Sequence, residues 1–157
     1  MELKTKVHAE DGKQELVITR TFDLPLELLF KAYIEPEIVE QWMGTKVVKL
    51  ENRQHGSWQF VTTDPMGNKH GFHGTIHECI LNQKITRTFE MENASFGAQL
   101  EFLEFEKITE NTSMLSMHII YRTVEIRDEI LKLPFAKGIN MAHNRLENIV
   151  SQLNKPS

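Results

Sequence analysis

The 157-residue sequence has a single cysteine, Cys79, and no apolar run that approaches the roughly 20 residues needed to span a bilayer. One cysteine excludes an internal disulfide and is typical of a protein from a reducing compartment. Residues 1–20 contain no apolar stretch after a basic start, so we expect no signal peptide. These absences predict a cytoplasmic protein that does not insert into a membrane.

The sequence also lacks an excess of positive charge. It has 18 lysines and arginines against 22 aspartates and glutamates, which gives a net charge of −4 and a pI of about 6.0. Nucleic acid is therefore not an expected partner. There is no internal repeat, low-complexity tract or Pro/Gly/Ser-rich linker, and the length suits one domain over residues 1–157.

Motifs for catalysis and metal binding are missing too. No G-x-S-x-G, P-loop or G-x-G-x-x-G run occurs. His73 and His77 would share a face of a strand but lie about 13 Å apart, too far to hold one ion. Cys79 has Ile80 and Leu81 beside it and no cationic neighbour, so we interpret it as a packing residue. We expect no catalytic residue, no metal and no cofactor.

The clearest pattern that is present lies near the end, over residues 137–153. Apolar residues recur there at steps of three and four, at Ile139, Ala142, Leu146, Ile149, Val150 and Leu153. This spacing predicts an amphipathic helix with one apolar stripe. We assign the opposite face to Lys137, Asn140, Asn144, Arg145, Glu147 and Asn148.

Most of the preceding chain has the alternation and the turn residues of β-strands. We predict a first strand over residues 15–22 and six more over residues 46–51, 57–63, 70–81, 84–91, 99–108 and 113–121. Gly71 and Gly74 lie inside one strand, where they predict a bulge or sharp curvature. Consecutive strands with short turns form an antiparallel meander.

Three short helices are predicted between and after these strands. We expect Asp23 to cap the first, which ends near Tyr33. The second begins at Pro36 and ends at Gly44, and Thr123 caps a third over residues 124–133. The fold class is therefore α+β, with a curved antiparallel sheet wrapped around the C-terminal helix and a cavity between them.

Several short runs, in this order and at this spacing, are also similar to those of one known family. They are Phe22-Asp23-Leu24-Pro25 with Leu29-Phe30 and Glu40-Gln41-Trp42; Asp64-Pro65-Met66-Gly67-Asn68 with Phe72-His73-Gly74; Glu78 with Lys84-Ile85 and Thr88-Phe89; and Glu125-Ile126-Arg127-Asp128 with Gly138 and Arg145-Leu146. Over residues 15–153 the chain thus resembles the START-like (SRPBCC) superfamily, within it the bacterial homologues of the activator of the heat-shock-protein-90 ATPase. It departs from that pattern in turns, at residues 53–56, Asn82 and residues 133–135.

The resemblance implies a helix-grip fold with a cavity between the sheet and the C-terminal helix. It does not imply one activity, because members of the superfamily bind lipids or other apolar molecules and some are cyclases or aromatases. The chaperone-related name belongs to one domain of a eukaryotic co-chaperone and carries little about function here.

One charged residue is expected to face the cavity. Ile85, Arg87, Phe89 and Met91 share one face of a strand by alternation, and three of the four are apolar, so this face looks inward. An inward arginine is costly unless it is paired. The partner is either a carboxylate of the protein, from Glu78 or Glu101, or an anionic ligand.

The candidate ligand-binding residues are those that this geometry directs toward the cavity. We predict Trp58, Phe60, Phe72, Ile85, Arg87, Phe89, Met91, Phe102, His118, Ala142 and Leu146. The sequence does not decide which face of the strand over residues 113–121 points inward, because Met114 and His118 lie on one face and Leu115 and Tyr121 on the other.

The function that these features favour is non-catalytic binding of a small, largely apolar molecule. A protein-interaction module, with a chaperone, a stress-related regulator or a second copy of the chain as partner, is one alternative. A cyclase- or hydrolase-type enzyme that uses an inward His, Glu or Arg is another. An exposed apolar patch would favour the first alternative, and a histidine and a carboxylate that converge in the cavity would favour the second.

Overall fold

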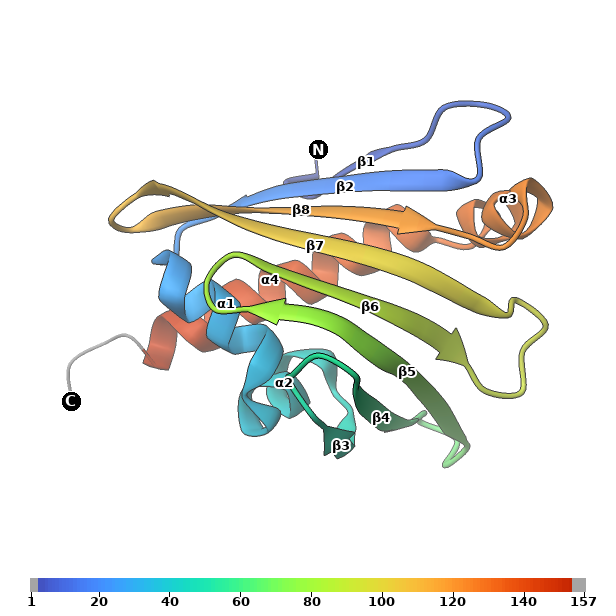
Figure 1. The fold of residues 1–157 in the computed structure, drawn as a ribbon, viewed down its shortest axis with the longest axis horizontal. Coiled ribbons are helices and arrows are strands. Elements are labelled where there is room, and N and C mark those ends of the chain that lie inside the picture. The colour runs from blue at the N-terminus through green and yellow to red at the C-terminus, as the bar shows by residue number, and fades with distance from the viewer. Residues whose placement is uncertain (1–2, 154–157) are drawn as a thin grey trace.

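A computed structural model describes residues 3–153 of the protein. Figure 1 shows one curved sheet with a long helix behind it. The strands are β1 (Lys6–His8), β2 (Glu15–Phe22), β3 (Lys46–Leu50), β4 (Gly56–Thr63), β5 (Lys69–Ile80), β6 (Lys84–Met91), β7 (Ala98–Thr109) and β8 (Thr112–Ile120). The helices are α1 (Leu26–Ile34), α2 (Pro36–Met43), α3 (Val124–Lys132) and α4 (Phe135–Leu153).

The sheet is antiparallel throughout its described pairs. Its order is β1-β2-β8-β7-β6-β5-β4-β3, so the predicted meander runs from β3 to β8 and is confirmed. The first long strand, β2, then joins the sheet beside the last one, β8. In Figure 1, α4 crosses behind the sheet, with α1 and α2 near one end of it and α3 near the other. This is the predicted α+β helix-grip fold.

The helix ends follow the expected signals except at α1. Gly44 ends α2 at φ +63°, a left-handed conformation that glycine adopts without strain. Thr123 Oγ1 accepts a hydrogen bond from Ile126 N and so caps α3. The prediction that Asp23 caps α1 is wrong, because the helix begins at Leu26, directly after Pro25, and has no side-chain cap. The backbone N–H of Asp23 instead donates to Glu147 Oε1.

Gly74 permits a close approach between strands β4, β5 and β6. A Cβ atom at this position would collide with the carbonyl oxygen of Thr88 and with Trp58 Nε1. Trp58 Nε1 donates a hydrogen bond of 3.1 Å to that same oxygen, so the missing side chain lets the indole lie across the sheet. The bulge expected near the glycines falls a little later, between Ile76 and Glu78.

Two clusters of buried side chains form the core. The larger lies between β2, β6, β7, β8, α1, α2 and α4, and it includes Leu146 and Val150, both fully buried. The smaller contains Val39, Trp58, Phe60 and Ile76. Half-buried Cys79 packs against both clusters, in agreement with its interpretation as a packing residue, and burial raises the pKa of its thiol.

Two leucines of the α4 stripe, Leu146 and Leu153, should differ sharply in their contribution to stability. Replacing Leu146, which is 0% exposed, with alanine should lower the free energy of unfolding by about 2–5 kcal/mol, because it leaves a cavity in the core. Leu153→Ala removes the same atoms from a side chain that is 54% exposed, and should cost less than about 0.5 kcal/mol. Urea unfolding of both variants measures the difference, and equal losses would contradict the placement of α4.

Candidate functional site

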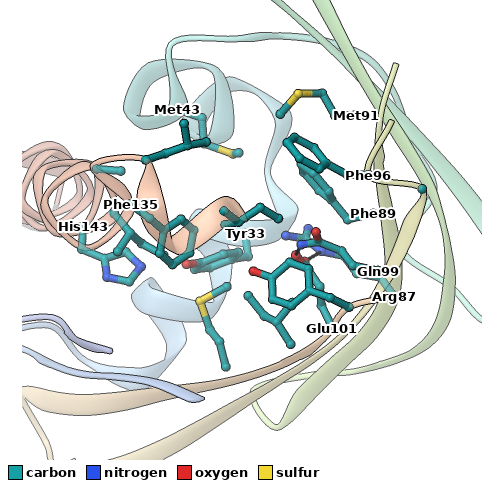
Figure 2. Close-up of a pocket in the computed structure, with 18 of the residues that line it drawn as sticks. Tyr33, Met43, Arg87, Phe89, Met91, Phe96, Gln99, Glu101, Phe135 and His143 are labelled. Atoms are coloured by element: carbon teal, nitrogen blue, oxygen red, sulfur yellow. Dashed lines mark hydrogen bonds and ion pairs between the residues drawn. The ribbon is translucent and has the colours of Figure 1, made fainter. Parts of the chain in front are cut away.

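A cavity of about 310 Å³ lies between the first half of α4 and the sheet. Its walls are mainly apolar, and Phe89, Met91, Phe96, Phe135, Ile139 and Ala142 are among them. Figure 2 shows these aromatic and sulfur-containing side chains around the hollow. The polar groups that line it are Tyr33, Arg87, Gln99, Glu101, Tyr121 and His143.

The cavity exists because the two halves of α4 meet different surroundings. In the second half, Leu146 and Val150 are in full contact with the core. In the first half, Ile139 and Ala142 continue the same apolar stripe but face the hollow. A small side chain at Ala142 leaves space that a larger one would fill.

Arg87 points inward from β6, as its alternation predicted. Its Nε donates to Glu101 Oε1 of β7 at 2.9 Å, and the two side chains are only 11% and 5% exposed. Glu101 Oε2 accepts a second hydrogen bond, of 2.8 Å, from Gln99 Nε2. The guanidinium also lies 5.2 Å from the ring centre of Trp58, within the range of a cation–π contact.

The partner of Arg87 is thus a carboxylate of the protein. Glu101 is one of the two candidates predicted, whereas the other, Glu78, pairs with Lys84 at 3.2 Å on the same sheet. Because Arg87 and Glu101 cancel in charge, this side of the cavity is polar but electrically neutral.

Two tyrosine hydroxyls also line the cavity, from Tyr33 of α1 and from Tyr121 just after β8. Burial raises the pKa of both hydroxyls, so they stay protonated at neutral pH. Neither hydroxyl has a hydrogen-bond partner among residues 3–153, and neither is among the fully enclosed polar atoms. Both side chains line the cavity, so their hydroxyls are donors available to a molecule inside it.

His143 lies on α4, on the opposite side of the hollow from Arg87 and Glu101 (Figure 2). Its Nδ1 is 2.8 Å from Thr5 Oγ1, and its ring meets Phe22 edge-on. Burial, helped by the charge of Arg20, lowers its pKa to about 3. The imidazole is therefore neutral at physiological pH and is a weak base.

Behind His143 lies a second inward arginine, Arg20 of β2. Its side chain is fully buried, and its Nη1 donates to Asn144 Oδ1 at 2.8 Å and to Thr5 Oγ1 at 3.2 Å. Glu147 supplies a carboxylate at 3.6 Å. Asn140 is buried in the same cluster, where its Oδ1 accepts from the backbone N–H of Thr5. The assignment of Asn140 to the outer face of the helix is therefore wrong.

The sequence contained a signal for Arg20 that the pattern reading missed. Leu16, Ile18 and Phe22 share one face of β2 and are buried, and Arg20 occupies the same face by strict alternation. The same argument identified Arg87. An arginine at an inward position needs acceptors, and here they come from polar residues of α4.

The structure brings some of the predicted ligand-binding residues to the cavity. Arg87, Phe89, Met91 and Ala142 line it directly, and Trp58 lies against Arg87. The remaining apolar residues pack in the two core clusters, namely Phe60, Phe72, Ile85 and Leu146.

The other two predicted residues, Phe102 and His118, lie on the outer face of the sheet. Their rings are 5.9 Å apart, and His118 Nε2 is 2.9 Å from Glu15 Oε2. The buried face of β8 carries Leu115, Met117 and Ile119, which decides the open question about this strand.

Within residues 3–153, no group of three or more His, Cys, Asp and Glu side chains is placed to hold a metal ion. None of the helices in that range is long and apolar enough to cross a membrane.

Comparison with known proteins agrees with this geometry. A long helix gripped by a curved antiparallel sheet defines the helix-grip class of α+β proteins. Residues 23–151 match the model of the family "Activator of Hsp90 ATPase homolog 1-like protein". The chain belongs to this family.

Solved structures from several bacteria have the same fold. A protein from Rhodobacter sphaeroides is 20% identical, with a TM-score of 0.83 and coverage of 95% of this chain and 99% of that one. A protein from Mycobacterium smegmatis is 18% identical, with a TM-score of 0.82 over 92% and 95% of the two chains. At this identity the similarity concerns the fold alone. A search of curated proteins found no match.

The buried, neutral His143 should make stability depend on pH. Burial holds the pKa of His143 at about 3 in the folded protein, whereas an unfolded histidine takes up a proton near pH 6.5. Protons therefore favour the unfolded state, and stability falls as pH drops through this window, by up to about 1.4 kcal/mol per pH unit.

The measurement is urea unfolding of the wild type and of His143→Gln between about pH 6.5 and 5, above the usual titration range of carboxylates. The wild type should lose more stability than the variant over this interval. Parallel pH profiles would mean that His143 is not held neutral.

Proposed function

We propose that the protein binds a small, uncharged, largely apolar molecule in the cavity between α4 and the sheet. The observation that carries this proposal is the makeup of the cavity wall. Apolar side chains from β6, β8, α3 and α4 surround a hollow whose one ion pair, Arg87 with Glu101, is neutral as a whole. Such a site suits an apolar body and gives no net attraction for an anion or a cation.

The volume of the cavity limits the size of the ligand. An apolar protein cavity of about 150 Å³ is known to accept benzene. The cavity here, at about 310 Å³, is roughly twice as large and suits a molecule of about two fused rings. Burying about 200–300 Å² of apolar surface would gain roughly 5–8 kcal/mol. Association costs offset part of this gain, so we expect micromolar or weaker binding.

Catalysis by the cavity residues has less support. His143 and Glu101 line the same hollow, but they lie on opposite sides of it (Figure 2). Both oxygens of Glu101 already accept hydrogen bonds, from Arg87 and Gln99, and the low pKa of His143 makes it a poor base. A general base works best with a pKa near neutrality and with a position next to the group that it deprotonates.

A protein-interaction role also has less support than ligand binding. Among residues 3–153, the large apolar side chains that are exposed are spread over several strands, turns and helices. They are Val48, Met66, Ile80, Leu81, Ile108, Leu133, Met141 and Leu153. Scattered apolar residues are normal on a protein surface. We retain a cytoplasmic location and one domain over residues 1–157 as part of the proposal, on the grounds of cysteine content and length given above.

The test is a thermal-shift screen of two-ring hydrocarbons and ketones. A ligand at about a hundred times its Kd should stabilise the protein by about 2.7 kcal/mol, which is a shift of several degrees. Ala142→Leu places a larger side chain in the cavity and should abolish the shift. Ala136→Leu adds the same atoms on the same helix, away from the cavity lining, and should keep it. Shifts that survive in Ala142→Leu would refute this site.

A further inference from the structure

The polar groups of the cavity contain more hydrogen-bond donors than the protein itself satisfies. Arg87 uses only its Nε in the contact with Glu101, and its Nη1 and Nη2 groups have no acceptor among residues 3–153. The hydroxyls of Tyr33 and Tyr121 likewise have none in that range. All three side chains line the cavity. A ligand that fills the cavity displaces water from these accessible donors, so it has to supply an acceptor in place of the water.

The carboxylate of the cavity, in contrast, is already engaged. Glu101 Oε1 accepts from Arg87, and Glu101 Oε2 accepts from Gln99. The Glu101 carboxylate therefore has less capacity for a ligand donor than the three donor side chains have for a ligand acceptor.

The unmatched donors all line the same cavity. Figure 2 shows Arg87, Gln99 and Glu101 side by side on the sheet, with Tyr33 next to them and His143 on the far side. The charges of Arg87 and Glu101 both influence the hydroxyl of Tyr33, and the charge of Glu101 influences that of Tyr121. Apart from His143, the remaining walls are mainly apolar, so hydrogen-bond donors are few in this cavity and each of them matters for a ligand.

We propose that the ligand is an uncharged carbonyl compound, a ketone or a quinone, whose oxygen accepts hydrogen bonds from Arg87, Tyr33 and Tyr121. This inference rests on the proposed function and names its ligand class. The apolar body of the ligand lies against Phe89, Phe96 and Phe135. A carbonyl oxygen offers two lone pairs and no proton, which complements a set of donors.

A carboxylate is a poor alternative because of Glu101. Arg87 would attract the carboxylate of an acidic ligand. The Glu101 carboxylate, whose Oε1 is 2.9 Å from Arg87 Nε, would repel that ligand carboxylate. The ion pair thus keeps the donors of Arg87 while removing its preference for anions. This makes Glu101 a specificity-determining residue.

The first experiment compares three probes of one shape, tetralin, α-tetralone and tetralin-α-carboxylate, by isothermal titration calorimetry at neutral pH. Tyr33→Phe and Tyr121→Phe each remove one hydroxyl oxygen. Each variant should weaken the binding of α-tetralone about fivefold, which corresponds to the loss of one hydrogen bond, and should leave the affinity for tetralin unchanged. Because the hydroxyls have no hydrogen-bond partner among residues 3–153, neither variant should lower the melting temperature. Phe135→Leu is the control, and should weaken both probes to the same extent.

The second experiment reverses the selection against acids. Wild-type protein should bind tetralin-α-carboxylate at least about tenfold more weakly than α-tetralone. Glu101→Gln keeps the shape of the side chain and removes its charge, so Arg87 is left with a net charge facing the cavity. This variant should bind the acid about tenfold more tightly than the wild type does, with α-tetralone little changed.

The outcomes separate the two proposals. If none of the three probes binds, tetralin included, the proposed function itself is overturned. If tetralin and α-tetralone both bind, but each tyrosine variant changes the affinity for the two probes by the same factor, the proposed binding site is retained and the carbonyl assignment is wrong. If the wild type prefers the acid, or Glu101→Gln does not gain affinity for it, the assigned role of Glu101 is wrong.

Discussion

The packing of α4 on the sheet is the contact on which the rest of the structure depends. Its second half is held by apolar burial, with Leu146 and Val150 in the core. Its first half is held at the side by a polar cluster, in which Arg20 of β2 donates to Asn144. Apolar contact is therefore not required along the whole stripe. Because hydrogen bonds fix the first half in place, the sheet can curve away beneath Ala142 and leave a cavity there.

Two inward arginines make this arrangement possible, and both obtain their counter-charge from the protein. Arg20 lies near Glu147, and Arg87 is bonded to Glu101. An unpaired cation in either place would be expensive, and it would bias the cavity toward anions. With both charges matched internally, the ligand that we propose is selected by the direction of hydrogen bonds and by shape. The neutral imidazole of His143, which lies between the Arg20 cluster and the hollow, fits the same pattern.

Alternation along strands predicted part of the site from the sequence. The part that was not predicted depends on single polar residues that stand among apolar ones. Arg87 among apolar neighbours was recognised as inward, and the structure agrees. Arg20 also stands among apolar residues on one face of its strand, but only its apolar neighbours were assigned to the inward face. Asn140 was misplaced because a helical stripe assigns polar residues outward, and the acceptors that Arg20 needs come from another element. Tyr33 follows the buried face of α1, and Tyr121 follows that of β8, so their local periods place both inside. A local period does not say which inward positions border a cavity.

The family fixes the frame of the site and leaves its chemistry to a few side chains. Solved structures that share 14–20% of residues superpose over nearly the whole chain, so the fold tolerates extensive substitution. Shape follows from the apolar pattern, which many residues satisfy. Donor direction follows from individual atoms, such as a tyrosine oxygen or a guanidinium nitrogen. A change of Glu101 to a neutral residue would leave the fold intact in principle while altering the charge that the cavity presents. Ligand class can therefore diverge within this fold through single positions, and it has to be read from each member's own side chains.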